Sequence, residues 1–92
     1  MKTMPYGQHD DEHAMVAQIK AAMELVTSGK DVTIYITCPS IEFKMNIFSK
    51  DIKQKLQEVQ VAGRTLVFKR AHGEVHCYDL DKALHVAIYI QE

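Results

Sequence analysis

The sequence predicts an α+β fold, a two-layer sandwich in which two helices cover one face of a mainly antiparallel five-stranded sheet. Two observations support this prediction. Segments whose apolar residues recur every three or four positions are interspersed with segments whose apolar residues alternate, in the order αββαβββ. The links between alternating segments are short, and short links join antiparallel neighbours. A chain of 92 residues has room for a single core of this kind.

The chain is expected to have two parts. Residues 1–9 contain Pro5 and Gly7 and lack apolar periodicity, which predicts a flexible N-terminal arm. Residues 10–92 are expected to form the single α+β domain.

The first helix is predicted over residues 11–28. Asp10 or Asp11 supplies a carboxylate that can cap its N-terminus. Gly29 suits the left-handed conformation that ends many helices. Apolar residues spaced by three and four positions predict the buried side of the helix, namely Met15, Ile19, Met23 and Val26.

Two alternating segments follow, over residues 32–37 and 41–47. The link between them contains Pro39, which cannot donate to a strand ladder. Two alternating segments with a short connection predict an antiparallel hairpin.

A second helix is predicted over residues 49–62. Ser49 is the expected N-cap, and Ile52, Leu56 and Val59 form the expected apolar stripe. Three further strands complete the predicted sheet, over residues 64–70, 75–78 and 84–90.

The composition excludes several classes of protein. No run of about 18 consecutive apolar residues is present, so no membrane span is expected. The two cysteines, Cys38 and Cys77, are expected to be reduced thiols of a cytoplasmic protein. The four glycines are scattered and form no phosphate-binding loop, so neither a cofactor nor a small-molecule substrate is predicted.

Positive charge is concentrated between residues 44 and 72. This segment carries seven basic and two acidic residues, or +5, whereas the whole chain carries −1. Strand parity divides it into two smaller patches, one on the second helix and one on the open sheet face. Such patches are suited to phosphates or an acidic protein surface, although a solvated charged face is the alternative. The predicted contact residues are Lys44, Lys50, Lys53, Lys55, Arg64, Lys69 and Arg70.

Strand parity also predicts that three tyrosines lie on the uncovered face of the sheet, namely Tyr35, Tyr78 and Tyr89. The same parity places Lys44 and Lys69 beside them. Aromatic rings interleaved with lysine on an open sheet are typical of proteins that stack single-stranded nucleic acid. Tyrosine is also a good strand former, so a purely structural role is the alternative.

The histidines suggest two further kinds of site. His9 and His13, like His72 and His76, have a spacing that metal ligands use, but no second matched pair accompanies either, so no metal site is predicted. His72 or His76 could be the general base of a small nuclease, although no residue pattern supplies the partners that such a base needs. The sequence therefore favours a protein that is not an enzyme.

In its general character the chain resembles the small phage-encoded anti-CRISPR proteins that inhibit type I-F surveillance complexes. The resemblance covers the whole chain and rests on its length, its single α+β domain, the lack of a catalytic motif and the divided surface charge. These inhibitors share no sequence motif, so no residue role can be carried over.

The resemblance implies a stoichiometric inhibitor in the cytoplasm of a bacterial host. Its partner would be a bacterial protein or ribonucleoprotein complex, with guide RNA as one contact, and binding would block target-DNA recognition. An exposed final strand could also pair edge to edge and form a homodimer.

Overall fold

The computed structural model describes residues 14–91, which form two helices, six strands and one short 3-10 turn. The predicted arm at residues 1–9 and the capping carboxylates Asp10 and Asp11 lie outside the described residues. The helices are α2 (Ala14–Thr27) and α3 (Ser49–Lys53), and the 3-10 turn is Leu80–Lys82. The strands are β1 (Asp31–Thr37), β2 (Glu42–Ile47), β3 (Gln57–Ala62), β4 (Thr65–Arg70), β5 (Val75–Asp79) and β6 (His85–Gln91).

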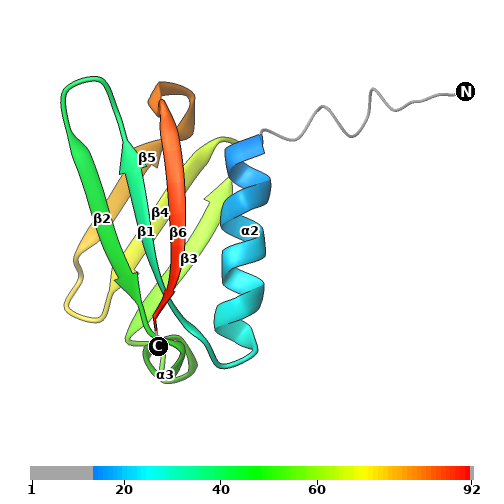
Figure 1. Cartoon of the computed structure of the whole chain (residues 1–92). Helices are drawn as coiled ribbons and strands as arrows, with labels where there is room; N and C mark the ends of the chain where they lie inside the picture. Colours follow the sequence, from blue (N-terminus) through cyan, green and yellow to red (C-terminus); the bar gives the residue numbers. More distant parts are fainter. Residues whose placement is uncertain (1–13, 92) are drawn as a thin grey trace, which may run out of the picture.

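The strands form two three-stranded antiparallel sheets instead of the predicted single five-stranded sheet. The β1 sheet has the order β2–β1–β6, and the β4 sheet has the order β3–β4–β5. One sheet lies behind the other, and α2 runs alongside β6 and β3 (Figure 1). The α+β class is confirmed, whereas the arrangement of two helices on one face of one sheet is wrong.

The predicted second helix is the main error, because α3 ends at Lys53 and the chain then forms β3. Lys55 takes a positive φ of 62°, which stops the helix. Val59 and Val61 are two positions apart and face the core from the extended chain, a pattern of period two. The spacing of Ile52, Leu56 and Val59 fits a helix equally well, so periodicity alone selected the wrong structure.

The first helix ends as predicted. Gly29 has a φ of +108°, and its N–H donates to the carbonyl of Val26 at 3.0 Å. The N–H of Lys30 donates to the carbonyl of Leu25 at 3.0 Å, which completes a Schellman motif.

The core lies where α2 and the inner faces of both sheets meet. Ring contact between Phe43 of β2 and Tyr78 of β5, with centroids 4.8 Å apart, joins the two sheets on the side away from α2. The largest fully buried side chains are Ile19, Val26, Val32, Ile34, Ile36, Met45, Ile47, Leu66 and Leu80. Complete burial of such a side chain contributes about 1.5–3 kcal/mol.

Two buried polar side chains hold α3 and the strand ends in place. Gln57 accepts a hydrogen bond from the N–H of Phe48 at 3.0 Å and donates to the carbonyl of Asn46 at 2.9 Å, which ties β3 to the end of β2. Ser49 is not the predicted N-cap of its helix; its hydroxyl donates to the carbonyl of Val26 at 2.8 Å. Both side chains are satisfied, as burial requires.

Candidate binding surfaces

The outer face of the β1 sheet brings together three of the predicted contact residues. Tyr35 on β1 lies directly between Lys44 on β2 and Ala87 on β6, and Tyr89 is the next outward residue on β6. The Tyr35 and Tyr89 rings meet edge to face with centroids 5.6 Å apart. The Lys44 ammonium lies 5.8 Å from the centre of the Tyr35 ring, within the range of a cation–π contact.

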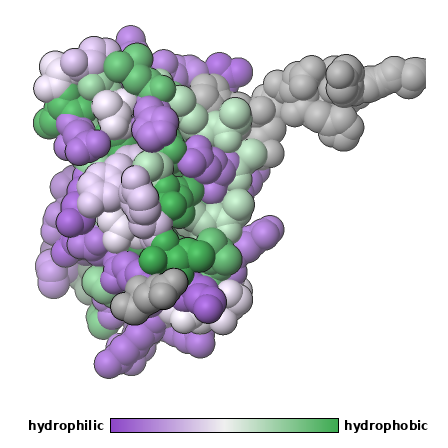
Figure 2. Space-filling model, in the orientation of Figure 1, coloured by the Kyte–Doolittle hydropathy of each residue, from purple (hydrophilic) through white to green (hydrophobic). Residues whose placement is uncertain are grey.

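A shallow groove of about 400 Å³ opens beside these rings, lined by Tyr35, Glu42, His85, Ala87 and Tyr89. The small Ala87 side chain lies opposite Tyr35, so the larger neighbours form walls around it. Figure 2 shows this side of the molecule as a mixture of hydrophilic and intermediate residues, with a hydrophobic band closer to α2. The exposed ring of Tyr89, with 58% of its residue surface accessible, can stack a further planar group.

Hydrogen bonds fix the side chains around this face. Thr33 donates to Asn46 Oδ1 at 2.9 Å, and Gln91 donates to Thr33 Oγ1 at 2.9 Å. At the other end Thr37 donates to Glu42 Oε2 at 3.1 Å. These cross-strand bonds reduce the freedom of the face before any partner binds.

Tyr78 does not belong to this face, which corrects the sequence prediction. It lies on the inner side of the β4 sheet, where its ring packs against Phe43. Burial, followed by the charge of Glu74, raises the pKa of the Tyr78 hydroxyl above its ordinary value. The β5 strand pairs with β4 in a second sheet, so strand parity could not place Tyr78 relative to Tyr35 and Tyr89.

The basic residues are distributed over separate places, so the expectation of only two patches is wrong. Lys50 and Lys53 of α3 line a recess of about 470 Å³ together with Asp31 at the end of the β1 sheet. Lys55 follows α3 and lines a groove between α2 and β3. Lys44 alone of the seven predicted basic residues lies on the outer face of the β1 sheet.

The remaining three basic residues belong to the β4 sheet. Lys69 lies on its outer face, opposite Glu58 and not beside Lys44. Arg64 forms an ion pair with Asp81 at 2.9 Å, between two half-exposed side chains. Arg70 lies over the Phe68 ring, with its guanidinium 5.5 Å from the ring centre.

His76 points to the inner side of β5, between Phe68 and Tyr78. It hydrogen-bonds Glu74, and this bond lowers the pKa of the Glu74 carboxyl. Within residues 14–91 no three His, Cys, Asp or Glu side chains converge on a position that could hold a metal ion. The nuclease hypothesis for His72 or His76 stays a prediction.

Comparison with protein families, curated proteins and solved structures finds no match for this chain. None of the helices in the described residues is long and apolar enough to cross a membrane. The candidate site therefore has to be argued from its own residues. Sequence reasoning found its tyrosines and Lys44, but it missed Ala87, whose small size matters only once its neighbours on β1 are known.

Proposed function

We propose that this protein is a non-enzymatic binding protein that docks on a bacterial ribonucleoprotein and contacts its exposed single-stranded RNA. The contact surface is the outer face of the β1 sheet. The observation that supports this proposal is the cluster of Tyr35, Tyr89 and Lys44 beside a shallow groove of about 400 Å³. Aromatic stacking contributes about 1–3 kcal/mol per base, and lysine supplies a phosphate contact.

The position of α3 supports a path for the phosphate backbone. Lys50 and Lys53 line the recess beside Asp31, and Asp31 pairs with Gln91 at one end of the same sheet. A strand of RNA that stacks on Tyr89 would extend its phosphates toward these lysines.

The resemblance to small inhibitors of type I-F surveillance complexes supplies the proposed setting. In that setting the protein binds the complex stoichiometrically, covers part of its guide RNA and prevents target-DNA recognition. A free module that binds single-stranded nucleic acid through the same face is the alternative, since the same tyrosines would carry it.

A first experiment measures binding of labelled single-stranded RNA at two salt concentrations. The Tyr89→Ala substitution is expected to weaken binding roughly 5- to 100-fold, because one stacked base is lost. Tyr78→Phe is the matched control, because Tyr78 faces the core side and should leave affinity unchanged. The Lys44→Ala variant should lower the salt slope by about one unit.

A second experiment separates the ribonucleoprotein setting from free RNA binding. A purified type I-F surveillance complex is mixed with the protein, and its binding to target DNA is measured. The parent protein should abolish target binding, and a Tyr35→Ala, Tyr89→Ala double variant should not, with an unchanged circular dichroism spectrum. Lys50→Glu together with Lys53→Glu should weaken inhibition less than the tyrosine pair.

Each outcome bears on a different part of the proposal. RNA binding without inhibition would reject the inhibitor and favour the alternative, a free module that binds single-stranded nucleic acid. Inhibition that survives loss of both tyrosines would show that the inhibitory contact lies on another surface of the protein. No binding to RNA below ~100 μM at low salt would exclude the nucleic-acid contact, given how strongly low salt favours such binding.

A further inference from the structure

Within residues 14–91, β3 pairs with β4 alone, so its other edge, beside α2, has no strand partner there. Its partner β4 pairs in a register in which Leu56 lies opposite Ala71, and the Ala71 N–H donates to the Leu56 carbonyl. Hydrogen-bonded pairs in an antiparallel ladder alternate, so Glu58 and Gln60 also point their backbone groups at β4. The N–H and C=O groups of Val59 and Val61 consequently point away from β4.

No hydrogen bond from another described residue reaches these outward groups of Val59 and Val61. The opposite case occurs on β6, the edge strand of the other sheet that runs beside α2. There Gln18 of α2 donates its side-chain amide to the Val86 carbonyl at 2.8 Å. The helix therefore covers part of the β6 edge, whereas none of its described residues bonds to the outward groups of β3.

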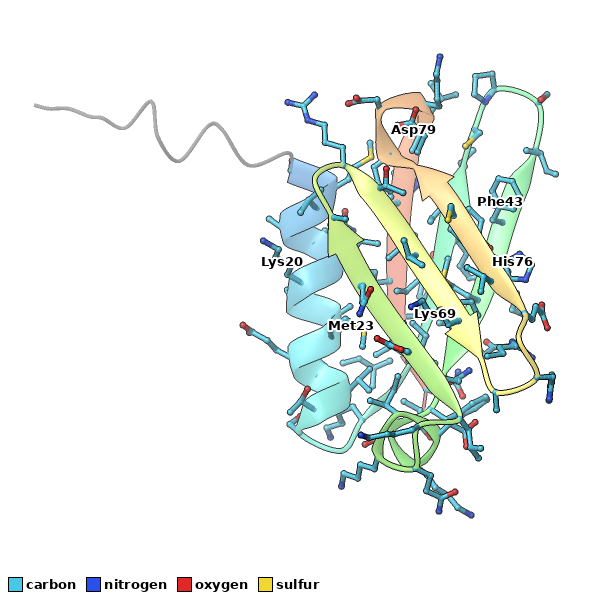
Figure 3. All side chains as sticks on the ribbon, turned by 180° about the vertical axis from the view of Figure 1, so that it is seen from behind. Lys20, Met23, Phe43, Lys69, His76 and Asp79 are labelled. Carbon is cyan, nitrogen blue, oxygen red and sulfur yellow. The ribbon has the colours of Figure 1, made fainter. Side chains whose placement is uncertain are left out.

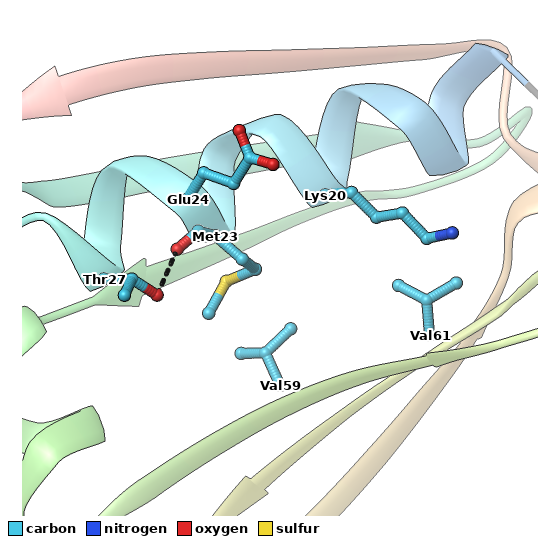
Figure 4. A pocket seen from close by; sticks show the side chains of 6 residues that line it. All are labelled: Lys20, Met23, Glu24, Thr27, Val59 and Val61. Atoms are coloured by element: carbon cyan, nitrogen blue, oxygen red, sulfur yellow. Dashed lines mark hydrogen bonds between the residues drawn. The ribbon is translucent and has the colours of Figure 1, made fainter.

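The space between α2 and β3 is an apolar groove with two lobes. The first lobe, about 380 Å³, is lined by Met23 and Thr27 of α2 and by Val59 and Val61 (Figure 4). The second lobe, about 330 Å³, shares Met23 and Val59 and is closed by Ile52. The two lobes follow β3 and could receive two alternate side chains of an extended chain.

The charges around the groove are balanced. Lys20 and Glu24 line the first lobe, and Lys55 and Glu58 line the second. Met23 of α2 lies between the helix and β3 in the view from behind (Figure 3). A ligand whose inward side chains are uncharged therefore fits both lobes without leaving a rim charge unbalanced.

We propose that the groove between α2 and β3 binds an extended peptide segment of another protein, which adds a strand to the β4 sheet. Main-chain hydrogen bonds to Val59 and Val61 supply affinity, and the two lobes select apolar side chains at alternate positions. This mode suits the groove because an unpaired strand edge offers donors and acceptors at the spacing that only another extended chain matches. The proposal is independent of the RNA contact, which uses the other sheet.

The 92-residue chain is tested against a displayed library of short peptides with Val, Ile or Leu at alternate positions. A second library of the same composition, with the apolar residues placed consecutively, is the control. Enrichment is expected from the alternating library only. In the bound state the amides of Val59 and Val61 should become protected from hydrogen exchange, whereas the Gln60 amide should be protected with and without peptide.

Two substitutions test the geometry. Val61→Pro removes an outward N–H and spares the ladder to β4, so it should lower the melting temperature less than Gln60→Pro does and weaken peptide binding about tenfold or more. Gln60→Pro removes an N–H that pairs with β4 and should lower the melting temperature. Thr27→Trp fills the first lobe and should block binding, while Ala17→Trp, on an exposed part of the same helix outside the groove, should not.

Other occupants are distinguished by the same measurements. A concentration-dependent dimer that Val61→Pro abolishes would assign the edge to a second copy of this chain. Protection of the Val59 and Val61 amides in the protein alone would assign it to the chain itself. Either result overturns the proposal, as does peptide binding that survives both Val61→Pro and Thr27→Trp.

Discussion

The two sheets differ in how completely they are buried. Of the thirteen buried apolar residues that the structure describes, six belong to the β1 sheet and two, Leu66 and Phe68, belong to the β4 sheet. The central strand β1 has Val32, Ile34 and Ile36 with no accessible surface. Strand β5, at the edge of the β4 sheet, is exposed along most of its length.

This difference in burial suits the two sheets to different kinds of partner. The β1 sheet has its inner side filled by α2 and the core, and its outer face presents Tyr35 and Tyr89 in edge-to-face contact. The β4 sheet contributes less to the core, and within residues 14–91 no strand pairs with its edge at Val59 and Val61. A face with two packed rings suits stacking of a planar base, whereas an edge without a strand partner suits pairing with an extended chain.

The largest expected effect tests the difference in burial. Ile34→Ala should lower the free energy of unfolding by about 2–5 kcal/mol, because it opens a cavity at a fully buried site of the β1 sheet. Val67→Ala, on the outer face of the β4 sheet, should cost less than about 1 kcal/mol by comparison. Denaturant unfolding measures both. Equal losses would contradict the assignment of Val67 to an outer face.

The next effect tests the hydrogen bonds by which Gln57 of β3 links the two sheets. Gln57→Ala removes a buried side-chain amide and should cost about 2–3 kcal/mol, since the Phe48 N–H and the Asn46 carbonyl both lose their hydrogen-bond partner. The matched control is Gln60→Ala, because Gln60 is exposed on the same strand and should change stability by less than about 0.5 kcal/mol. If Gln57→Ala leaves the free energy of unfolding unchanged, water molecules take over the two hydrogen bonds of the Gln57 side chain.

Substitutions in the hairpin turns of the two sheets should change stability by smaller and unequal amounts. Gly63 at the β3–β4 turn has a φ of +62°, with no atom near the position of an added Cβ. Gly63→Ala should therefore cost about 1–2 kcal/mol through backbone conformation alone. Ser40→Ala, in the β1–β2 turn where no residue has positive φ, should be nearly neutral. Thermal unfolding distinguishes the two, and an unaffected Gly63→Ala would contradict the assigned turn.

The smallest effect is a pH dependence confined to the β4 sheet. The hydrogen bond from His76 lowers the pKa of Glu74 from its ordinary value of 4.5. A depressed folded-state pKa contributes stability that is present above pH 4.5 and is lost as pH falls through the folded value. NMR titration of the Glu74 carboxyl should show the lowered pKa in the parent and its return toward 4.5 in His76→Gln. A Glu74 titration that is identical in both proteins would exclude the His76 bond as the cause.

Most strands were predictable because their side chains alternate over several residues. Residues 32–37, 41–47 and 64–70 were predicted as strands, and β1, β2 and β4 occupy them. The Schellman motif at Gly29 followed from a single residue whose conformation is nearly unrestricted. Tyr35, Lys44 and Tyr89 were placed on one face by parity, because β1 pairs directly with both neighbouring strands.

The groove beside β3 could not be predicted, because the segment that forms it was assigned to a helix. Ile52, Leu56 and Val59 have helical spacing, and only the contacts of Val59 and Val61 with the core decide for a strand. Tyr78 and Lys69 were likewise assigned to the wrong surface, since parity orders residues within one sheet and not between two sheets.

The sequence by itself determined which residues alternate, where α2 ends and that Tyr35, Lys44 and Tyr89 share a face. These are local properties, set by side-chain period and by the freedom of a glycine backbone. Only the tertiary structure decided that the strands divide into two sheets and that β3 keeps an open edge beside α2. Those outcomes depend on which strands find one another across the chain, and the pairing energy of distant strands is absent from any local pattern.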